Sequence, residues 1–206
     1  MCLTVETVVA GNRERDHRWG FTTPPKLTLK SLLSFATHPK WAFNYLTHDK
    51  FQLANVSHWT KKGSSIAKGV MEYINEQYDP AMSWKDAEYV VKKWGGPFAL
   101  KGVMSVEDAK RAIDIGASAI LLSNHGGRQL DGSRSPFDQL PVIKEAVGDK
   151  LEIILDGGIR RGTHVLKALS LGATACSFGK GFLFALGAGG QAGVEQILKR
   201  MREEIR

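Results

Sequence analysis

A histidine and an arginine lie three positions apart in the string SNHGGRQLDG, which covers residues 123–132 and follows the apolar run 119–122. His125 has the kind of side chain that takes a proton near neutral pH. Arg128 has the kind that holds a carboxylate through two parallel hydrogen bonds. Together they indicate a substrate that is an acid and loses a proton. For these two residues alone, a polar loop with a surface arginine is the simpler interpretation, and the specificity lies in the whole ten-residue string.

Strands and helices must alternate along the chain to position that string. The run 119–122, bounded by small and turn residues, predicts a strand buried on both faces. Capping-box patterns at Ser83 and Ser105 predict that helices begin there. Expected strands cover residues 2–5, 97–100, 119–122, 151–155 and 174–178. Expected helices cover about 27–36, 65–77, 84–94, ten residues after Ser105, 136–147, 163–171 and 190–205.

This alternation predicts an α/β fold with a parallel sheet and helices outside it. No G-x-G-x-x-G string opens a helix, which favours a β/α barrel over a doubly wound sheet. A closed barrel requires eight strands. We therefore expect a partial (β/α)8 TIM barrel of about five strands, with two open edges and a long helical insertion after the first strand.

Candidate reactive residues lie just after the expected strands, so a barrel would gather them at one mouth. They are Glu6, Lys101, His125, Arg128, Asp156, Arg160 and Lys180. Small residues in the last two of these loops allow backbone N–H groups to approach a phosphate, and each loop also carries a cation. Those glycines are Gly157, Gly158 and Gly179. The simpler alternative is that the glycines only make tight turns.

The net charge of +7 comes entirely from residues 11–70, which hold ten Lys or Arg and three Asp or Glu. Aromatic residues intermix with these lysines, a combination that suits lipid headgroups or single-stranded nucleic acid. Alternatively, the segment packs its aromatic side chains on the barrel and solvates its lysines. Two cysteines indicate a reducing compartment. We find no signal peptide and no apolar run near the ~20 residues of a membrane span, and expect a cytoplasmic protein.

The string SNHGGRQLDG, with LKGV at 100–103 and LDGGIRRGTHVLKALSLGA at 155–173, closely resembles the FMN-dependent 2-hydroxy-acid dehydrogenases and oxidases. The segments THPKWAF and FLFALGAGGQAGVEQIL are most similar to the bacterial, membrane-associated L-lactate dehydrogenases. The resemblance covers essentially all 206 residues.

The resemblance implies a role for most of the candidates. His125 would take the substrate proton, Glu6 would stabilise the protonated histidine, and Lys101 would lie beside the flavin as a fixed cation. Arg128 and Arg13 would bind the substrate carboxylate. The residues that would contact FMN or its phosphate are Thr4, Lys101, Ser123, Asp156, Gly157, Gly158, Arg160, Gly179 and Lys180.

Three features depart from the pattern of the family. Glu6 stands where the family has Asp, and its extra methylene could displace the carboxylate from His125. Lys180 stands where the family has Arg, which keeps the charge but loses the two-pronged grip. The first three βα units, with an active-site Tyr, and the carboxyl-terminal extension have no counterpart. We therefore expect residues 1–206 to be one dehydrogenase domain, incomplete at its N-terminus, with residues 11–82 as an insertion.

The expected function is FMN-dependent oxidation of an L-2-hydroxy acid, with L-lactate to pyruvate favoured. The alternatives are a non-catalytic flavin- or phosphate-binding remnant, an oxidase that produces peroxide, and a membrane- or polyanion-binding module. Expected partners are the small 2-hydroxy acid, a membrane surface contacted peripherally through residues 11–70, and further copies of the chain. We expect neither nucleic acid nor a metal as a partner, and a location in the cytoplasm or on the cytoplasmic membrane.

Overall fold

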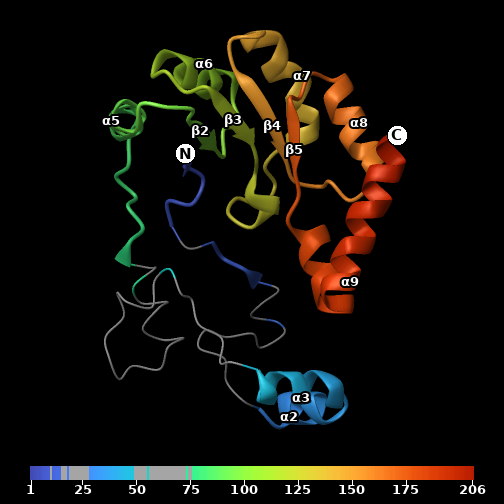
Figure 1. Cartoon of the computed structure of the whole chain (residues 1–206). Coiled ribbons are helices and arrows are strands. Elements are labelled where there is room, and N and C mark those ends of the chain that lie inside the picture. Colours follow the sequence, from blue (N-terminus) through green and yellow to red (C-terminus); the bar gives the residue numbers. More distant parts are fainter. Residues whose placement is uncertain (10, 15–17, 19–27, 49–54, 56–72, 74–75) are drawn as a thin grey trace. The chain divides into compact units, whose positions relative to one another are not determined.

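Five short strands form one parallel sheet whose spatial order follows the chain, β1-β2-β3-β4-β5 (Figure 1). They are β1 (Cys2–Thr4), β2 (Ala99–Lys101), β3 (Ala119–Leu122), β4 (Glu152–Asp156) and β5 (Ala175–Ser177). The expected strands are thus present, and most bounds shift by one or two residues. Sequential parallel pairing with helical crossovers is the order of a β/α barrel, and this confirms the predicted fold class.

The computed structural model describes the chain except residues 10, 15–17, 19–27, 49–54, 56–72 and 74–75. Its contacts divide the chain into two compact units. One unit comprises residues 1–11 and 80–206 and contains the sheet, and the other comprises residues 12–79. No helix in the described part of the chain is long and apolar enough to cross a membrane.

The core of the first unit lies between the sheet and its helices. Leu100, Ile120 and Ile153 occupy one register of β2, β3 and β4, and each is at most 1% exposed. Helices outside the curved sheet cover this face, as Figure 1 shows. These helices are α5 (Trp84–Trp94), α6 (Val106–Asp114), α7 (Pro136–Val147) and α8 (Gly162–Ser170).

The other face of the sheet is only partly covered. In β3, Ile120 and Leu122 are buried whereas Ala119 and Leu121 are partly exposed, so burial alternates with the period of a strand. The prediction that this strand is buried on both faces is therefore wrong. The physical reason is that the helices cover one face, while the five described strands do not close around the other.

Two helices begin where their capping residues predict. The Ser83 backbone N–H donates to Asp86 Oδ2 (2.8 Å) at the start of α5, and Ser105 Oγ accepts from the backbone N–H of Asp108 (3.0 Å) at the start of α6. Gly95 ends α5 in the left-handed region at φ 65°. Local hydrogen bonds thus fix where these helices begin and end.

The last helix, α9 (Lys180–Ile205), begins ten residues before its predicted start at residue 190. Several glycines in its first half hide the helical pattern, and Gly190 interrupts the helix at φ 59°. Near its other end, Glu204 accepts hydrogen bonds from the Gly162 N–H (2.7 Å) and Arg161 Nε (2.7 Å) at the start of α8. A β-carbon at Gly162 would lie 2.6 Å from the Glu204 β-carbon, so only glycine allows this approach.

The second unit contains α2 (Leu29–Ala36) and α3 (Pro39–Thr47). The first helix matches the predicted one at 27–36. The second was not predicted, although a proline at its first position is a recognised start signal. Neither helix has a buried residue. The helix predicted at 65–77 falls almost wholly on residues outside the described ones.

Candidate active site

The carboxyl ends of neighbouring strands carry a connected group of charged side chains. The Lys101 ammonium, at the end of β2, donates to Glu6 Oε1 and to Ser123 Oγ (3.1 Å), and lies 3.6 Å from Asp156 Oδ2. Parallel register explains this meeting, because Thr4, Lys101 and Leu121 occupy one level of β1, β2 and β3. The three charged side chains are 10–21% exposed, which strengthens their mutual attraction.

Ser123 is the one polar side chain among the buried residues of the described chain, at 1% exposure. Its hydroxyl donates to Asp156 Oδ2 (2.8 Å) and accepts from Lys101 Nζ (3.1 Å) and from the backbone N–H of His125 (3.1 Å). The hydroxyl therefore uses its donor and both of its acceptor sites. It links the ends of β2, β3 and β4 through one atom.

His125 begins the 3₁₀ turn η2 (His125–Gly127), which follows β3 after Ser123 and Asn124. Its Nδ1 lies 3.0 Å from Glu6 Oε1, so the carboxylate accepts a hydrogen bond from Nδ1–H and leaves Nε2 as the proton acceptor. His125 has φ 56°, which only a small fraction of non-glycine residues adopt. Such strain is common at functional sites.

The extra methylene of Glu6 is accommodated beside Gly102. A β-carbon at Gly102 would lie 2.2 Å from Glu6 Oε2, and Gly102 has φ 107°, so only glycine suits this position. Glu6 Oε1 contacts both Lys101 and His125, while Oε2 is buried without a hydrogen-bond partner among the described residues. The carboxylate therefore reaches His125 despite its greater length, but with only one of its oxygens satisfied.

The glycine turns after β4 and β5 leave room for an anion. Nothing lies within 4 Å of the β-carbon position at Gly158 or Gly179, and both residues are exposed. Arg160 and Lys180 are also exposed, and neither has an ion-pair partner in the described part of the chain. The Lys180 Nζ lies 3.3 Å from the β-carbon position of Gly126, so this cation is beside η2. Open backbone and unpaired cations are what a phosphate group requires.

The remaining predicted residues are less closely tied to this group. Thr4 is beside Lys101 in the sheet register, and Gly157 has φ 116° at the turn after β4. The Arg128 side chain is exposed, and among described residues it has no ion-pair partner. Arg13 is exposed in the second unit. The structure thus brings together Glu6, Lys101, Ser123, His125 and Asp156, and the roles of the two arginines stay predictions.

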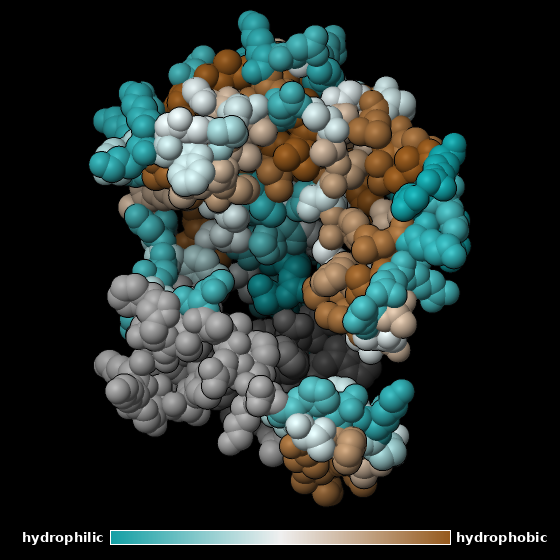
Figure 2. Space-filling view, viewed as in Figure 1, coloured by the Kyte–Doolittle hydropathy of each residue, from teal (hydrophilic) through white to brown (hydrophobic). Residues whose placement is uncertain are grey.

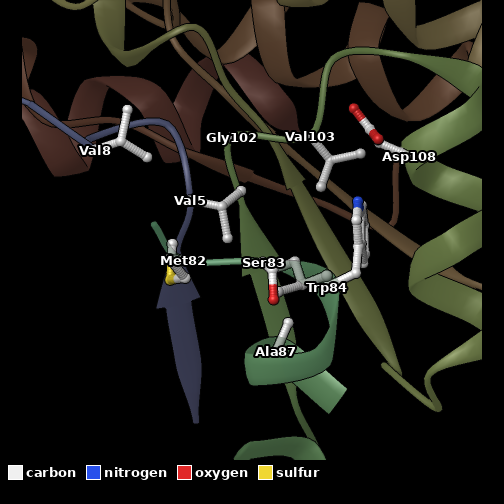
Figure 3. A pocket seen from close by; sticks show the side chains of 10 residues that line it. Val5, Val8, Met82, Ser83, Trp84, Ala87, Gly102, Val103 and Asp108 are labelled. Carbon is white, nitrogen blue, oxygen red and sulfur yellow. The ribbon is translucent and has the colours of Figure 1, made fainter. Parts of the chain in front are cut away.

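Two features beside the site were not predicted. Gln129 donates from Nε2 to the carbonyl oxygen of Val9 (2.9 Å), and it stands inside the string that the sequence already singled out. Behind Gly102, on the side of α5, lies a mostly apolar pocket of about 220 Å³. Figure 3 shows Val5, Met82 and Trp84 around this pocket, with Gly102 on its wall. No cluster of three potential metal ligands occurs among the residues that the structure describes.

Hydrophilic side chains gather at the carboxyl ends of the strands in Figure 2, whereas hydrophobic and hydrophilic surface lie side by side over α8 and α9. A parallel β/α sheet with a histidine, a lysine and two carboxylates at the carboxyl ends of its strands has the form of a barrel-type enzyme site. Open glycine turns with adjacent cations add a fit for a phosphate-bearing cofactor.

Comparison with known proteins identifies the family. Residues 1–206 match the family model described as FMN-dependent dehydrogenase, and the chain belongs to this family. An L-lactate dehydrogenase of Xanthomonas campestris pv. campestris (strain 8004) is 42% identical over 210 residues, covering 100% of this chain and 53% of that protein. A putative L-lactate dehydrogenase of Mycobacterium tuberculosis (strain ATCC 25618 / H37Rv) is 38% identical and covers 100% of this chain and 48% of that protein.

Among solved structures, the monotopic membrane protein (S)-mandelate dehydrogenase superposes with a TM-score of 0.90 at 34% identity. The match covers 99% of this chain and 53% of that one. The chain thus spans about half the length of the curated relatives it matches. These findings confirm the family predicted from the sequence, which is FMN-dependent.

Proposed function

We propose that the protein acts in the FMN-dependent oxidation of an L-2-hydroxy acid, with L-lactate to pyruvate as the favoured reaction. The observation that carries this proposal is the contact of Glu6 Oε1 with both His125 Nδ1 and Lys101 Nζ at the carboxyl ends of the strands. Further support comes from relatives named L-lactate dehydrogenase that cover the whole chain.

In this proposal, His125 Nε2 takes a proton from the substrate, and Glu6 stabilises the positive charge that the imidazole gains. Arg128 holds the substrate carboxylate, and Arg13 supplies a second contact. FMN, when bound, accepts the two electrons and the hydrogen that the substrate Cα loses. Lys101 is a fixed cation for the electron-accepting edge of the cofactor.

The cofactor would be held through its phosphate by the glycine turns and cations after the last two strands, and by polar groups at the strand ends. The residues are Thr4, Ser123, Asp156, Gly157, Gly158, Arg160, Gly179 and Lys180. Unpaired cations beside open backbone support this assignment, since the described residues supply no acid that would compete for Arg160 or Lys180.

The first experiment measures flavin absorbance on the purified chain and L-lactate turnover with a dye acceptor. A yellow protein that turns over L-lactate supports the proposal, and His125→Gln should abolish turnover without loss of colour. The control His48→Gln changes an exposed histidine at the end of α3 and should leave turnover unchanged. Colour without turnover indicates a non-catalytic remnant, whereas a colourless protein contradicts both flavin hypotheses.

A 2-hydroxy-acid oxidase is the alternative within the enzyme class. Because an oxidase passes electrons to oxygen, it would form peroxide in proportion to the substrate consumed, even without dye. A dehydrogenase would consume substrate only with the dye. Measuring peroxide against dye reduction in one preparation therefore decides between them.

We also propose that residues 11–82 are an insertion within one dehydrogenase domain, and that residues 11–70 contact a membrane peripherally. The separate compact unit at 12–79 supports the insertion. Residues 28–48 contain no acidic residue, and α2 and α3 expose large apolar side chains there. Among them, Leu29 is 74%, Phe43 67% and Leu46 81% exposed. Such a surface suits a headgroup region that is both anionic and apolar.

Co-sedimentation with liposomes, with and without anionic lipid, tests the membrane contact. We expect the wild type to pellet with anionic liposomes and Phe43→Ser to pellet less. The matched control is Phe184→Ser on α9, where the phenylalanine is 74% exposed, compared with 67% for Phe43. Equal losses in both variants, or no pelleting of the wild type, would contradict the proposal. A cytoplasmic location and a homo-oligomeric state belong to the same proposal, and sedimentation velocity tests the latter.

A further inference from the structure

After β1, the described residues 6–9 and 11 form no ladder of backbone hydrogen bonds. The last backbone bond of β1 runs from the N–H of Val5 to the carbonyl of Lys101 (2.8 Å). No backbone–backbone hydrogen bond joins the described residues 6–9 and 11 to another described residue. Glu6, whose carboxylate supports His125, is therefore the first residue after the last backbone hydrogen bond to the sheet.

A side chain from η2's own loop supplies the missing connection. Gln129 Nε2 donates to the carbonyl oxygen of Val9 (2.9 Å) and lies 3.4 Å from the carbonyl oxygen of Glu6. These partners are 120 and 123 residues away in sequence, and no backbone–backbone hydrogen bond between described residues connects the two loops that the amide joins. One amide N–H₂ group has two donors, which suits two carbonyl acceptors.

Close packing accompanies these hydrogen bonds. A β-carbon at Gly11 would lie 2.2 Å from the carbonyl oxygen of Arg128 and 2.3 Å from Gln129 Oε1. The end of the segment therefore rests directly on the backbone between the proposed substrate arginine and Gln129. A glycine is needed there for space, and Gln129 is held from both sides.

Glu6 needs an external restraint because its own bonds leave it poorly fixed. Both of its polar contacts use Oε1, and Oε2 is buried without a partner among described residues. Glutamate also has one more rotatable bond than aspartate. A carboxylate that is satisfied at one oxygen can rotate away from His125 unless its backbone is held in place.

We propose that Gln129 is a positioning residue: by tying the backbone of residues 6–9 to the loop that carries His125, it keeps the Glu6 carboxylate against the imidazole. This inference rests on the proposed function, because it assigns Gln129 to the support of the same base. Gln129 touches neither of the reacting groups itself and acts through Glu6.

The kinetic test is a double-mutant cycle between Gln129→Met and Glu6→Gln in the flavin-loaded chain. Methionine keeps the length of the side chain and removes its donors. We expect Gln129→Met to lower kcat roughly 10- to 100-fold, as a misplaced catalytic group does, with KM and flavin affinity within about twofold. Because both changes affect the same hydrogen bond, Gln129→Met should lower kcat little further in the Glu6→Gln background. Full additivity of the two losses would overturn the proposal.

The control is Gln191→Met, which removes a similar amide hydrogen bond, from Gln191 Nε2 to Glu195 Oε1 (2.7 Å), on exposed α9. Its kcat should equal that of the wild type. If Gln191→Met lowers kcat as much as Gln129→Met, the effect comes from general loss of stability and the proposal fails.

A spectroscopic readout keeps the test independent of turnover. The His125 Nδ1 proton, held by Glu6, should give a downfield proton resonance that His125→Gln and Glu6→Gln both remove. We expect this resonance to broaden or vanish in Gln129→Met and to persist in Gln191→Met. If the resonance persists in Gln129→Met, or is absent from the wild type, the proposed positioning role of Gln129 is wrong. If the wild type shows the resonance but no turnover, the proposed function fails, and the resonance in Gln129→Met still decides whether Gln129 positions Glu6.

Discussion

Two carboxylates in this chain, Glu6 and Glu204, each accept hydrogen bonds from two basic side chains, but their oxygens are satisfied very differently. Glu204 uses both oxygens: Oε1 accepts from Arg161 and Arg200, and Oε2 accepts from the Gly162 N–H (2.7 Å). Glu6 uses Oε1 for both Lys101 and His125 and leaves Oε2 buried and unpaired. Full pairing suits a structural role for Glu204, whereas the partly paired Glu6 lies beside the histidine that we propose as the base.

The largest expected effect is on turnover at the partly paired carboxylate. Glu6→Gln should lower kcat by roughly 10²–10⁴-fold, because the imidazolium loses its countercharge. The melting temperature should change less than kcat, because Lys101 keeps Asp156 as an ion-pair partner. Steady-state assays with L-lactate and circular dichroism melts measure the two quantities. Glu204→Gln is the matched control and should keep wild-type kcat. Equal kcat in Glu6→Gln and wild type would remove the distinction between the two carboxylates.

The second effect concerns the space beside Glu6. Gly102→Ala should lower the free energy of unfolding by roughly 2–5 kcal/mol, since it adds left-handed backbone strain and an overlap with the Glu6 carboxylate. Gly95→Ala is the control, because Gly95 is also left-handed but has nothing within 4 Å of its β-carbon position. Strain alone predicts a loss of about 1–2 kcal/mol there. If urea titrations give the two variants equal losses in the free energy of unfolding, the Glu6 side chain moves to make room for the new methyl group.

The smallest effect is the pH dependence of the fully paired carboxylate. Its hydrogen bond with Arg161, aided by the Gly162 N–H and Arg200, lowers the pKa of Glu204 to about 2. Because this pKa is below the ordinary value of 4.5, Glu204 stabilises the fold fully above that pH and loses its contribution as the pH falls toward 2. The melting temperature of Glu204→Gln should therefore be lower than that of the wild type at pH 7, and the difference should vanish near pH 2.

Asp149→Asn provides the control for that series. The Lys144 ammonium also lowers the pKa of Asp149, but this side chain is fully exposed, and exposed pairs stabilise little. Its melting curve should follow the wild type at every pH. A pH-independent difference for Glu204→Gln would mean that packing against Gly162, rather than charge, holds α8 to α9.

Local signals in the sequence predicted much of the site. Lys101, Asp156 and His125 each follow an apolar run, and the carboxyl ends of parallel strands share one edge, so their meeting was foreseeable. The sequence could not show that Gly102 faces Glu6 or that Gln129 reaches Val9, because these contacts join loops about a hundred residues apart. Such distances depend on the register of strands that no short pattern encodes.

The helices divide in the same way. The capping patterns at Ser83 and Ser105 predicted the starts of α5 and α6, because a helix cap involves residues only a few positions apart in sequence. The early start of α9 was missed because glycines mask its period, and α3 was missed because aromatic residues and lysines were attributed to a surface instead of a helix. The clamp of Glu204 on Gly162 joins positions 42 apart, and a surface glutamate near a helix end gives no local sign of it.

The outermost strands, β1 and β5, are three residues each, while the central β3 and β4 have four and five. Within the described residues each outer strand is paired on one side only. An edge strand this short offers few unpaired backbone N–H and C=O groups to another molecule. Aggregation by edge-to-edge strand pairing would therefore form few hydrogen bonds for each molecule added. The tendency to aggregate should therefore depend more on exposed hydrophobic side chains of the helices, such as Phe184, than on the edge strands of the sheet.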